Sequence, residues 1–219
     1  YAKDNHERTK SLMLSMSKLG YIMVYVLSLP ISLEVEYILN IWLGGTVPKY
    51  TAIFTVLVLL NMALGSLNIP ISQTVQATGH IQRYQTIRSL IVTSALPLSW
   101  LALICGAPAY IIFVILILVN MINQPISMYL LRKVFKYSYR EYFSIVILPC
   151  FLFSIVAPIL PIVIHLIMKE SFGRLLLVCF VSVVISTILV YFVIMTKSEK
   201  MFIKVMIDRY KPFGRKDVN

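Results

Sequence analysis

Six long apolar stretches, separated by short polar segments, run along this chain of 219 residues. Each is about as long as the roughly 20 residues that an α-helix needs to cross a bilayer. Because backbone polar groups inside lipid must be paired within their own segment, such stretches predict helices. The sequence thus predicts an all-α, polytopic transmembrane helical bundle over residues 1–196. Its six spans are Leu12–Leu33, Thr51–Val75, Ile87–Cys105, Ala109–Leu131, Tyr142–Met168 and Phe172–Met195.

The composition agrees with a membrane protein, and the charges predict its orientation. Hydrophobic residues make up 59% of the chain, and the mean hydropathy is +0.85. With six spans, the connections alternate between two sides. Of the 20 basic residues, only Lys49, Lys169 and Arg174 fall on the side away from the termini. Since positive residues mark the cytoplasmic side, both termini are expected to be cytoplasmic.

The basic segment 197–219 is predicted to form a cytoplasmic tail. Apolar residues alternate there with Lys and Arg, which is typical of an amphipathic helix on a membrane surface. The net charge of +11 then reflects topology and attraction to anionic headgroups. Membrane lipids, and not nucleic acid, are the partners that this charge predicts.

The beginning of the chain predicts a fragment. The chain opens with Tyr1, and its first residues are polar and charged, as in a loop that leads into a span. We therefore expect the C-terminal part of a longer membrane protein. Lys18 lies near the cytoplasmic end of the first span, where its long side chain is expected to reach the headgroups.

The connections also carry local signals. Apolar residues at helical spacing in 34–45 predict a short interfacial helix that stops at Gly44-Gly45. The sequence Gly106-Ala107-Pro108 predicts a tight turn. The segment 78–88 is expected to be a short inner loop. The last span has no proline and is expected to be a plain lipid-facing helix.

Prolines interrupt five of the six spans and predict kinks. They are Pro30, Pro70, Pro97, Pro125, Pro149, Pro158 and Pro161. A proline inside a helix removes one backbone donor and clashes with the preceding turn. Kinked helices are common where a membrane protein bends or exposes backbone to a cavity, which favours a transporter over a passive anchor.

The spans contain few groups that could do covalent chemistry. We expect the acidic residues to lie in loops, tails or at span boundaries, so paired carboxylates for catalysis are not predicted. Cys105, Cys150 and Cys179 have no metal-ligand spacing and are expected to be packing residues. His165 is either a packing histidine or a substrate or proton group. The sequence predicts no enzyme, no cofactor and no metal site.

Amides are the main polar groups inside the spans. Asn61, Asn68 and Gln76 are spaced to lie near one face of the second span, with Gln73 between them, and Asn120 and Gln124 follow a similar spacing in the fourth. Two interpretations stay open. These amides either join helices by hydrogen bonds, or they line a polar cavity that binds a sugar or headgroup, because an amide both donates and accepts.

Arg83 and Arg88 follow the polar end of the second span. Guanidinium groups bind phosphate with two parallel hydrogen bonds and keep their charge when buried. The pair could therefore hold a pyrophosphate at the cytoplasmic mouth, with Lys18 as a third candidate. The alternative is that both arginines only contribute to the positive-inside charge.

Several strings resemble one family of transporters. They are LPISLEVEYILNIWLG, VPKYTAIF and QTVQATGHIQRYQ, the last followed by Pro97. They are similar to the C-terminal half of the Wzx-type bacterial flippases for O-antigen and exopolysaccharide, in the superfamily of multidrug, oligosaccharidyl-lipid and polysaccharide exporters that includes the MATE transporters. The resemblance covers nearly the whole chain and is strongest over residues 1–100.

The resemblance implies a function and a setting. Such proteins flip undecaprenyl-pyrophosphate-linked oligosaccharides across the bacterial inner membrane, through a cavity between two helical lobes, for lipopolysaccharide and polysaccharide biosynthesis. This chain would be the second lobe, and the missing N-terminal lobe would be its partner. The candidate substrate-binding residues are then Arg83, Arg88, Asn68, Gln73, Gln76, Asn120 and Gln124.

Three other functions remain open. A MATE-like multidrug or cation antiporter would share the fold and would have its acidic coupling residue in the missing lobe. A membrane polysaccharide polymerase or glycosyltransferase would need a larger outer loop with acids or histidines. A purely structural membrane subunit would need none of these features.

Overall fold

The computed structural model describes residues 2–77, 81–132, 138–195 and 200–201. All regular structure within these ranges is helical, which confirms the all-α fold. Six helical units are long and apolar enough to cross a membrane, as predicted. They are Glu7–Leu33, Thr51–Ala77, Gln82–Ile104, Ile111–Arg132, Tyr139–Ile167 and Phe172–Ile194. Most of the predicted tail and residues 133–137 lie outside the described residues.

Several of these units consist of shorter helices joined end to end. The elements in chain order are α1 (Ala2–Leu33), α2 (Val35–Leu43), α3 (Thr51–Ser66), α4 (Ile69–Ala77), α5 (Ile81–Thr93), α6 (Ala95–Ile104), α7 (Ile111–Arg132), α8 (Tyr139–Tyr142), the π-helical turn η1 (Phe143–Ile147), α9 (Leu148–Val156), α10 (Ile159–Ile167), α11 (Phe172–Leu189) and the π-helical turn η2 (Val190–Ile194).

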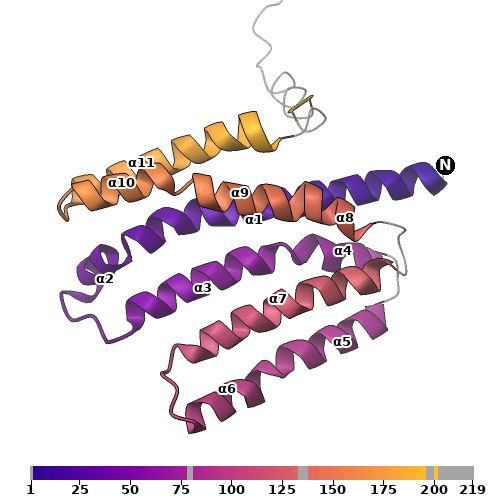
Figure 1. Cartoon of the computed structure of the whole chain (residues 1–219), viewed down its shortest axis with the longest axis horizontal. Coiled ribbons are helices and arrows are strands. Elements are labelled where there is room, and N and C mark those ends of the chain that lie inside the picture. Colours follow the sequence, from indigo (N-terminus) through magenta and orange to yellow (C-terminus); the bar gives the residue numbers. More distant parts are fainter. Residues whose placement is uncertain (1, 78–80, 133–137, 196–199, 202–219) are drawn as a thin grey trace, which may run out of the picture.

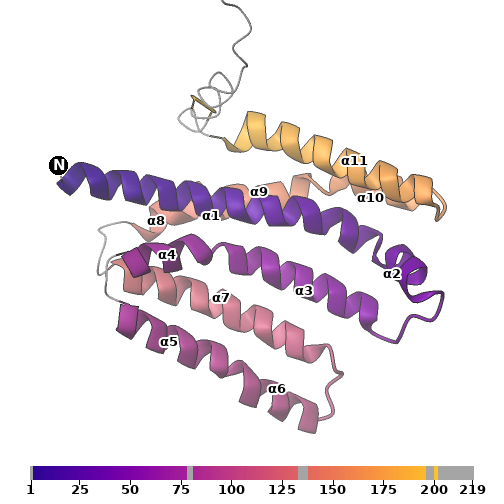
Figure 2. The ribbon, with the colours of Figure 1, turned by 180° about the vertical axis from the view of Figure 1, so that it is seen from behind.

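The helices lie side by side in a flattened bundle (Figure 1). The α5–α6 unit forms one edge and α11 the other, with α7, α3–α4 and α1 between them. The α8–α10 unit lies against one face of α1, and Figure 2 shows the other face of α1 from behind. We call the end with the N-terminus, α4 and α8 the basic end. The end with α2 and the α10–α11 turn is the opposite end.

Four prolines lie where a helix restarts. Pro70, Pro97, Pro149 and Pro161 each occupy the second or third position of α4, α6, α9 and α10. A proline in the first turn of a helix has no N–H to leave unpaired, so it suits a restart better than a helix interior. The predicted interruption of the second span is confirmed, between Ser66 and Ile69.

The predicted connections at the opposite end are also confirmed. The helix α2 occupies the place of the expected interfacial helix, with Val35 and Leu39 buried and Trp42 exposed. Gly44 ends it in the left-handed conformation at φ 67°, which glycine adopts without steric cost. Gly106 has φ 83° in the predicted turn between α6 and α7.

Two predicted loops are helical instead. The polar first residues belong to α1, which begins at Ala2. Residues 81–88 of the inner loop expected over 78–88 are helical, because α5 begins at Ile81 and carries Arg83 and Arg88; residues 78–80 lie outside the described residues. Neither 2–11 nor 81–88 contains a proline or glycine that would stop a helix, so the apolar stretches alone underestimated the helix length.

Two further predictions about the spans are wrong. Lys18 is 1% exposed and donates from Nζ to the carbonyl of Ile194 at 3.2 Å, so it does not reach the headgroups. The last span is not a plain lipid-facing helix. It carries the buried Arg174 in its first turn, and Ser182 and Ser186 are fully buried. The reason is that α11 packs along α1, which covers this face.

Candidate functional site

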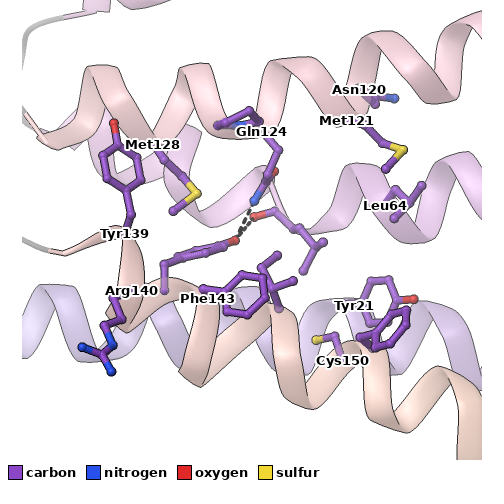
Figure 3. A pocket seen from close by; sticks show the side chains of 15 residues that line it. Tyr21, Leu64, Asn120, Met121, Gln124, Met128, Tyr139, Arg140, Phe143 and Cys150 are labelled. Carbon is purple, nitrogen blue, oxygen red and sulfur yellow. Dashed lines mark hydrogen bonds between the residues drawn. The ribbon is translucent and has the colours of Figure 1, made fainter.

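A cavity of about 610 Å³ opens in the half of the bundle next to the basic end. Its wall comes from α1, the end of α3, α7, and the chain from α8 to α9 (Figure 3). Most of the lining is apolar or aromatic. The lining residues are Tyr21, Leu64, Leu67, Asn120, Met121, Gln124, Pro125, Met128, Tyr139, Arg140, Tyr142, Phe143, Ile147, Cys150 and Phe151.

A hydrogen-bonded pair lies in the wall of this cavity. The Gln124 amide nitrogen donates to the Tyr142 hydroxyl at 2.7 Å, and this hydroxyl lies 3.4 Å from the carbonyl oxygen of Leu67, to which it donates (Figure 3). Leu67 lies at the break between α3 and α4, where the helix ladder is interrupted. The pair therefore joins α7, α8 and the broken second span at one point.

A second polar point lies where α1 meets α9. The Tyr21 hydroxyl is 2.7 Å from the Ser154 hydroxyl, and Tyr25 donates to the Ser154 carbonyl at 2.9 Å. Ser154 also donates to the carbonyl of Cys150. These bonds satisfy the phenol groups, which leaves the Tyr21 ring as an aromatic wall of the cavity.

The π-helical turn η1 shapes the side of the cavity. Phe143 and Ile147, its first and last residues, both line the cavity. A π-helical turn adds one residue to the helix and so turns the following side chains to new directions. Such turns are frequent at functional sites, and this one lies between the Tyr142 hydroxyl and the apolar wall of α9.

One charged residue, Arg140, belongs to the lining of the cavity. Arg140 is exposed, and in Figure 3 its guanidinium group points away from Gln124. Next to it, Lys10 of α1 and Glu141 of α8 form an ion pair at 2.8 Å. The cavity thus combines an apolar wall, a few amide and phenol groups, and a cation at its edge. This set of groups can hold an amphipathic molecule with an anionic head.

Two of the seven predicted site residues line the cavity. They are Asn120 and Gln124 on α7. Asn120 also donates to the side-chain oxygen of Asn61 at 2.6 Å, so it joins α7 to α3 as well. This amide therefore links two helices and also lines the cavity.

The other five predicted residues do not line this cavity. Gln73, Gln76 and Arg83 are exposed on α4 and α5. Asn68 is buried at the α3–α4 break, and its amide has no hydrogen-bond partner within the described ranges. Arg88 donates to the Ser72 hydroxyl at 3.0 Å, which joins α5 to α4. The break at 67–68 also ends the helical periodicity that had placed Asn68 and Gln76 on one face.

Three residues of the cavity were missed by the sequence analysis. Tyr21 and Tyr142 lie within or at the edge of apolar spans, where a tyrosine carries no signal of its own. Arg140 was counted only as part of the positive-inside charge. A usable signal was Pro70, which predicted the interruption of the second span. Tyr142 bonds to the Leu67 carbonyl at that break, and it directly precedes a π-helical turn.

Comparison with known proteins gives no relative: no family model, no curated protein and no solved structure matches this chain.

Proposed function

We propose that this chain is part of a membrane transporter that moves lipid-linked oligosaccharide across a bacterial inner membrane, with both of its termini cytoplasmic. The observation that carries the proposal is the cavity beside Gln124 and Tyr142. Its apolar and aromatic wall suits an isoprenoid chain, and its amide and phenol groups suit sugar hydroxyls or headgroup oxygens. The string resemblance to Wzx-type flippases agrees with this substrate.

We assign the pyrophosphate contact to Arg140, whose guanidinium group points outward from the rim (Figure 3). It lies at the rim of the cavity, whereas Arg83 and Arg88 lie on α5, outside its lining. A guanidinium at the edge of an apolar cavity attracts a phosphate and leaves the lipid chain to the wall. Arg83 and Arg88 remain candidates for an earlier contact at the basic end, where the substrate would first approach.

The charge at the rim also favours this function over a multidrug antiporter. A lipophilic cation would gain from the tyrosine rings of the cavity, but Arg140 would repel it. Within the described residues the connections at the opposite end are short, and they do not offer the large catalytic loop that a polymerase or glycosyltransferase requires.

The test measures translocation by the intact protein carrying Arg140→Gln and by a double variant that carries Arg83→Gln and Arg88→Gln. Loss of one charge-assisted hydrogen bond is worth about 1.5–3 kcal/mol, so Arg140→Gln should reduce translocation of lipid-linked oligosaccharide in vesicles by roughly tenfold or more. Lys49→Gln, an exposed cation at the opposite end, serves as the control. If Arg140→Gln translocates normally, or the protein exports lipophilic cations instead, the proposal is wrong.

A further inference from the structure

Glu34 lies between α1 and α2 at the opposite end of the bundle, close to the α10–α11 turn (Figure 1). The sequence placed it at the boundary of a span, among residues facing the surface. In the structure its side chain has no exposed area. A carboxylate taken out of water costs several kcal/mol unless charged or hydrogen-bonding partners compensate it.

Two residues far along the chain compensate this carboxylate. Arg174 of α11 donates to Oε2 from Nε at 3.1 Å and from Nη2 at 2.7 Å. Its remaining nitrogen donates to the carbonyl of Met168 at 3.1 Å. His165 of α10 lies with Nδ1 at 2.9 Å from Oε1. One carboxylate therefore holds the α10–α11 hairpin to the junction of α1 and α2.

Only one of the three groups can readily exchange a proton with water. The Glu34 and Arg174 side chains are 0% and 6% exposed, and guanidinium does not lose its proton in proteins. The His165 side chain is 32% exposed. Since Glu34 and Arg174 already balance each other, the proton on His165 decides whether the cluster carries a net positive charge.

The geometry gives the sign of the effect. His165 contacts Oε1, whereas Arg174 contacts Oε2 on the other side of the carboxylate, so the imidazole is closer to the negative charge than to the positive one. Because the acceptor is an ionised carboxylate, this hydrogen bond is charge-assisted in either state, and protonation of His165 adds a second formal charge that makes it an ion pair.

The neighbouring titratable groups, in the part of the chain that the structure describes, form no ion pair that would change the charge of the cluster. At this end of the packed elements the other titratable or charged groups are Glu36 and Tyr37 on α2, Lys169 and Glu170 in the α10–α11 turn, and Cys179 on α11. Within the described residues, none of them forms an ion pair with the cluster. Cys179 is near enough to Glu34 for the two to interact electrostatically.

A break between two helices lies at the other end of α10. The helix α9 ends at Val156 and α10 begins at Ile159, with Ala157 and Pro158 between them. Because proline has no N–H, the helix ladder is weakened there. The short helix α10 thus has a break at one end and the Glu34 contact at the other.

We propose that Glu34, His165 and Arg174 form a proton-operated latch. Arg174 holds α11 to Glu34 in both states, and protonated His165 additionally holds α10 against the α1–α2 junction. Loss of the proton removes this ion pair, leaves a weaker hydrogen bond from His165 to the carboxylate, and allows α10 to turn at Ala157–Pro158. The proton is the ligand of this site, and the proposal does not depend on what the cavity binds.

The test is a distance measurement across the latch. Spin labels on cysteines at Ile41 of α2 and Leu166 of α10, which are 59% and 75% exposed, would be placed in the intact, otherwise cysteine-free protein in lipid nanodiscs. Distances would be measured by pulsed electron resonance from about pH 5 to about pH 8, the range in which histidine serves as a charge switch in proteins. The parent should show one short distance at low pH and an added longer one at high pH.

Two variants at His165 are expected to hold the protein in one of the two proposed arrangements at every pH. His165→Gln, which cannot be charged but can still donate a hydrogen bond, should show the high-pH distances throughout. His165→Lys, charged over the whole range, should keep the short distance. Glu170→Gln in the nearby turn should behave as the parent. A parent whose distances do not change with pH, or a His165→Gln variant that keeps the pH dependence, would overturn the latch.

Discussion

The side chain of Gln124 donates to the hydroxyl of Tyr142 at 2.7 Å across the wall of the cavity. The two residues belong to different spans, and the same hydroxyl lies 3.4 Å from the Leu67 carbonyl, where the second span is broken. One hydroxyl thus connects three membrane-spanning units beside the space that we propose for the substrate. Its removal affects both the packing of the bundle and the polar part of the cavity.

Tyr142→Phe should lower the free energy of unfolding by about 1–3 kcal/mol, because the half-buried Gln124 amide loses its partner. The ring is retained, so the packing of the fully buried Tyr142 is unchanged apart from the hydroxyl. Equilibrium unfolding in mixed micelles measures the change. Tyr110→Phe, whose ring packs on Tyr50 at the opposite end, is the matched control and should be near the parent. Equal stabilities of the two variants would contradict a structural role of the pair.

Glu34→Ala should be more damaging, because it leaves the buried guanidinium of Arg174 without its counter-charge. Breaking a buried ion pair at one side costs about 3–5 kcal/mol. The control is Glu36→Ala, two residues further along and exposed, for which we expect a change within about 0.5 kcal/mol. Thermal unfolding of the three proteins in the same lipid gives the comparison. A Glu34→Ala protein as stable as the control would show that this contact adds nothing.

Lys18 should be protected from water-soluble amine reagents. It is 1% exposed and bonded to the Ile194 carbonyl, whereas Lys49 is exposed. Modification of a buried group requires local opening of the bundle, so Lys18 should react at least roughly tenfold more slowly than Lys49 in solubilised protein. Mass spectrometry of the labelled peptides measures both rates. Similar rates would show that Lys18 lies at the surface, as its sequence environment predicts, and would contradict its burial.

The arrangement of spans could be predicted from the sequence, since hydrophobic length alone fixes where helices cross a membrane. The proline positions also located the interruptions, although not their detail. Pro70 predicted a kink, and the structure places the break a few residues earlier because the proline suits the first turn of the next helix.

Contacts between distant segments could not be predicted in this way. Glu34 is adjacent to a span and flanked by apolar residues at helical spacing, which is the pattern of a surface residue on an interfacial helix. It is buried only because Arg174 and His165, more than 130 residues further along, meet it there. The same applies to Lys18, whose position near the basic end is as expected, but whose burial depends on the end of α11.

The measurement that tests the proposed substrate cavity most directly is protection of cysteines placed in its wall. Met121→Cys and Phe143→Cys line the cavity, while Phe180→Cys on α11 is an exposed apolar position outside its lining. We expect a water-soluble thiol reagent to label the two cavity cysteines in the intact, otherwise cysteine-free protein in membranes. Lipid-linked oligosaccharide should then slow this labelling, with no effect at Phe180→Cys. Labelling of both cavity positions that the substrate leaves unchanged would contradict the account.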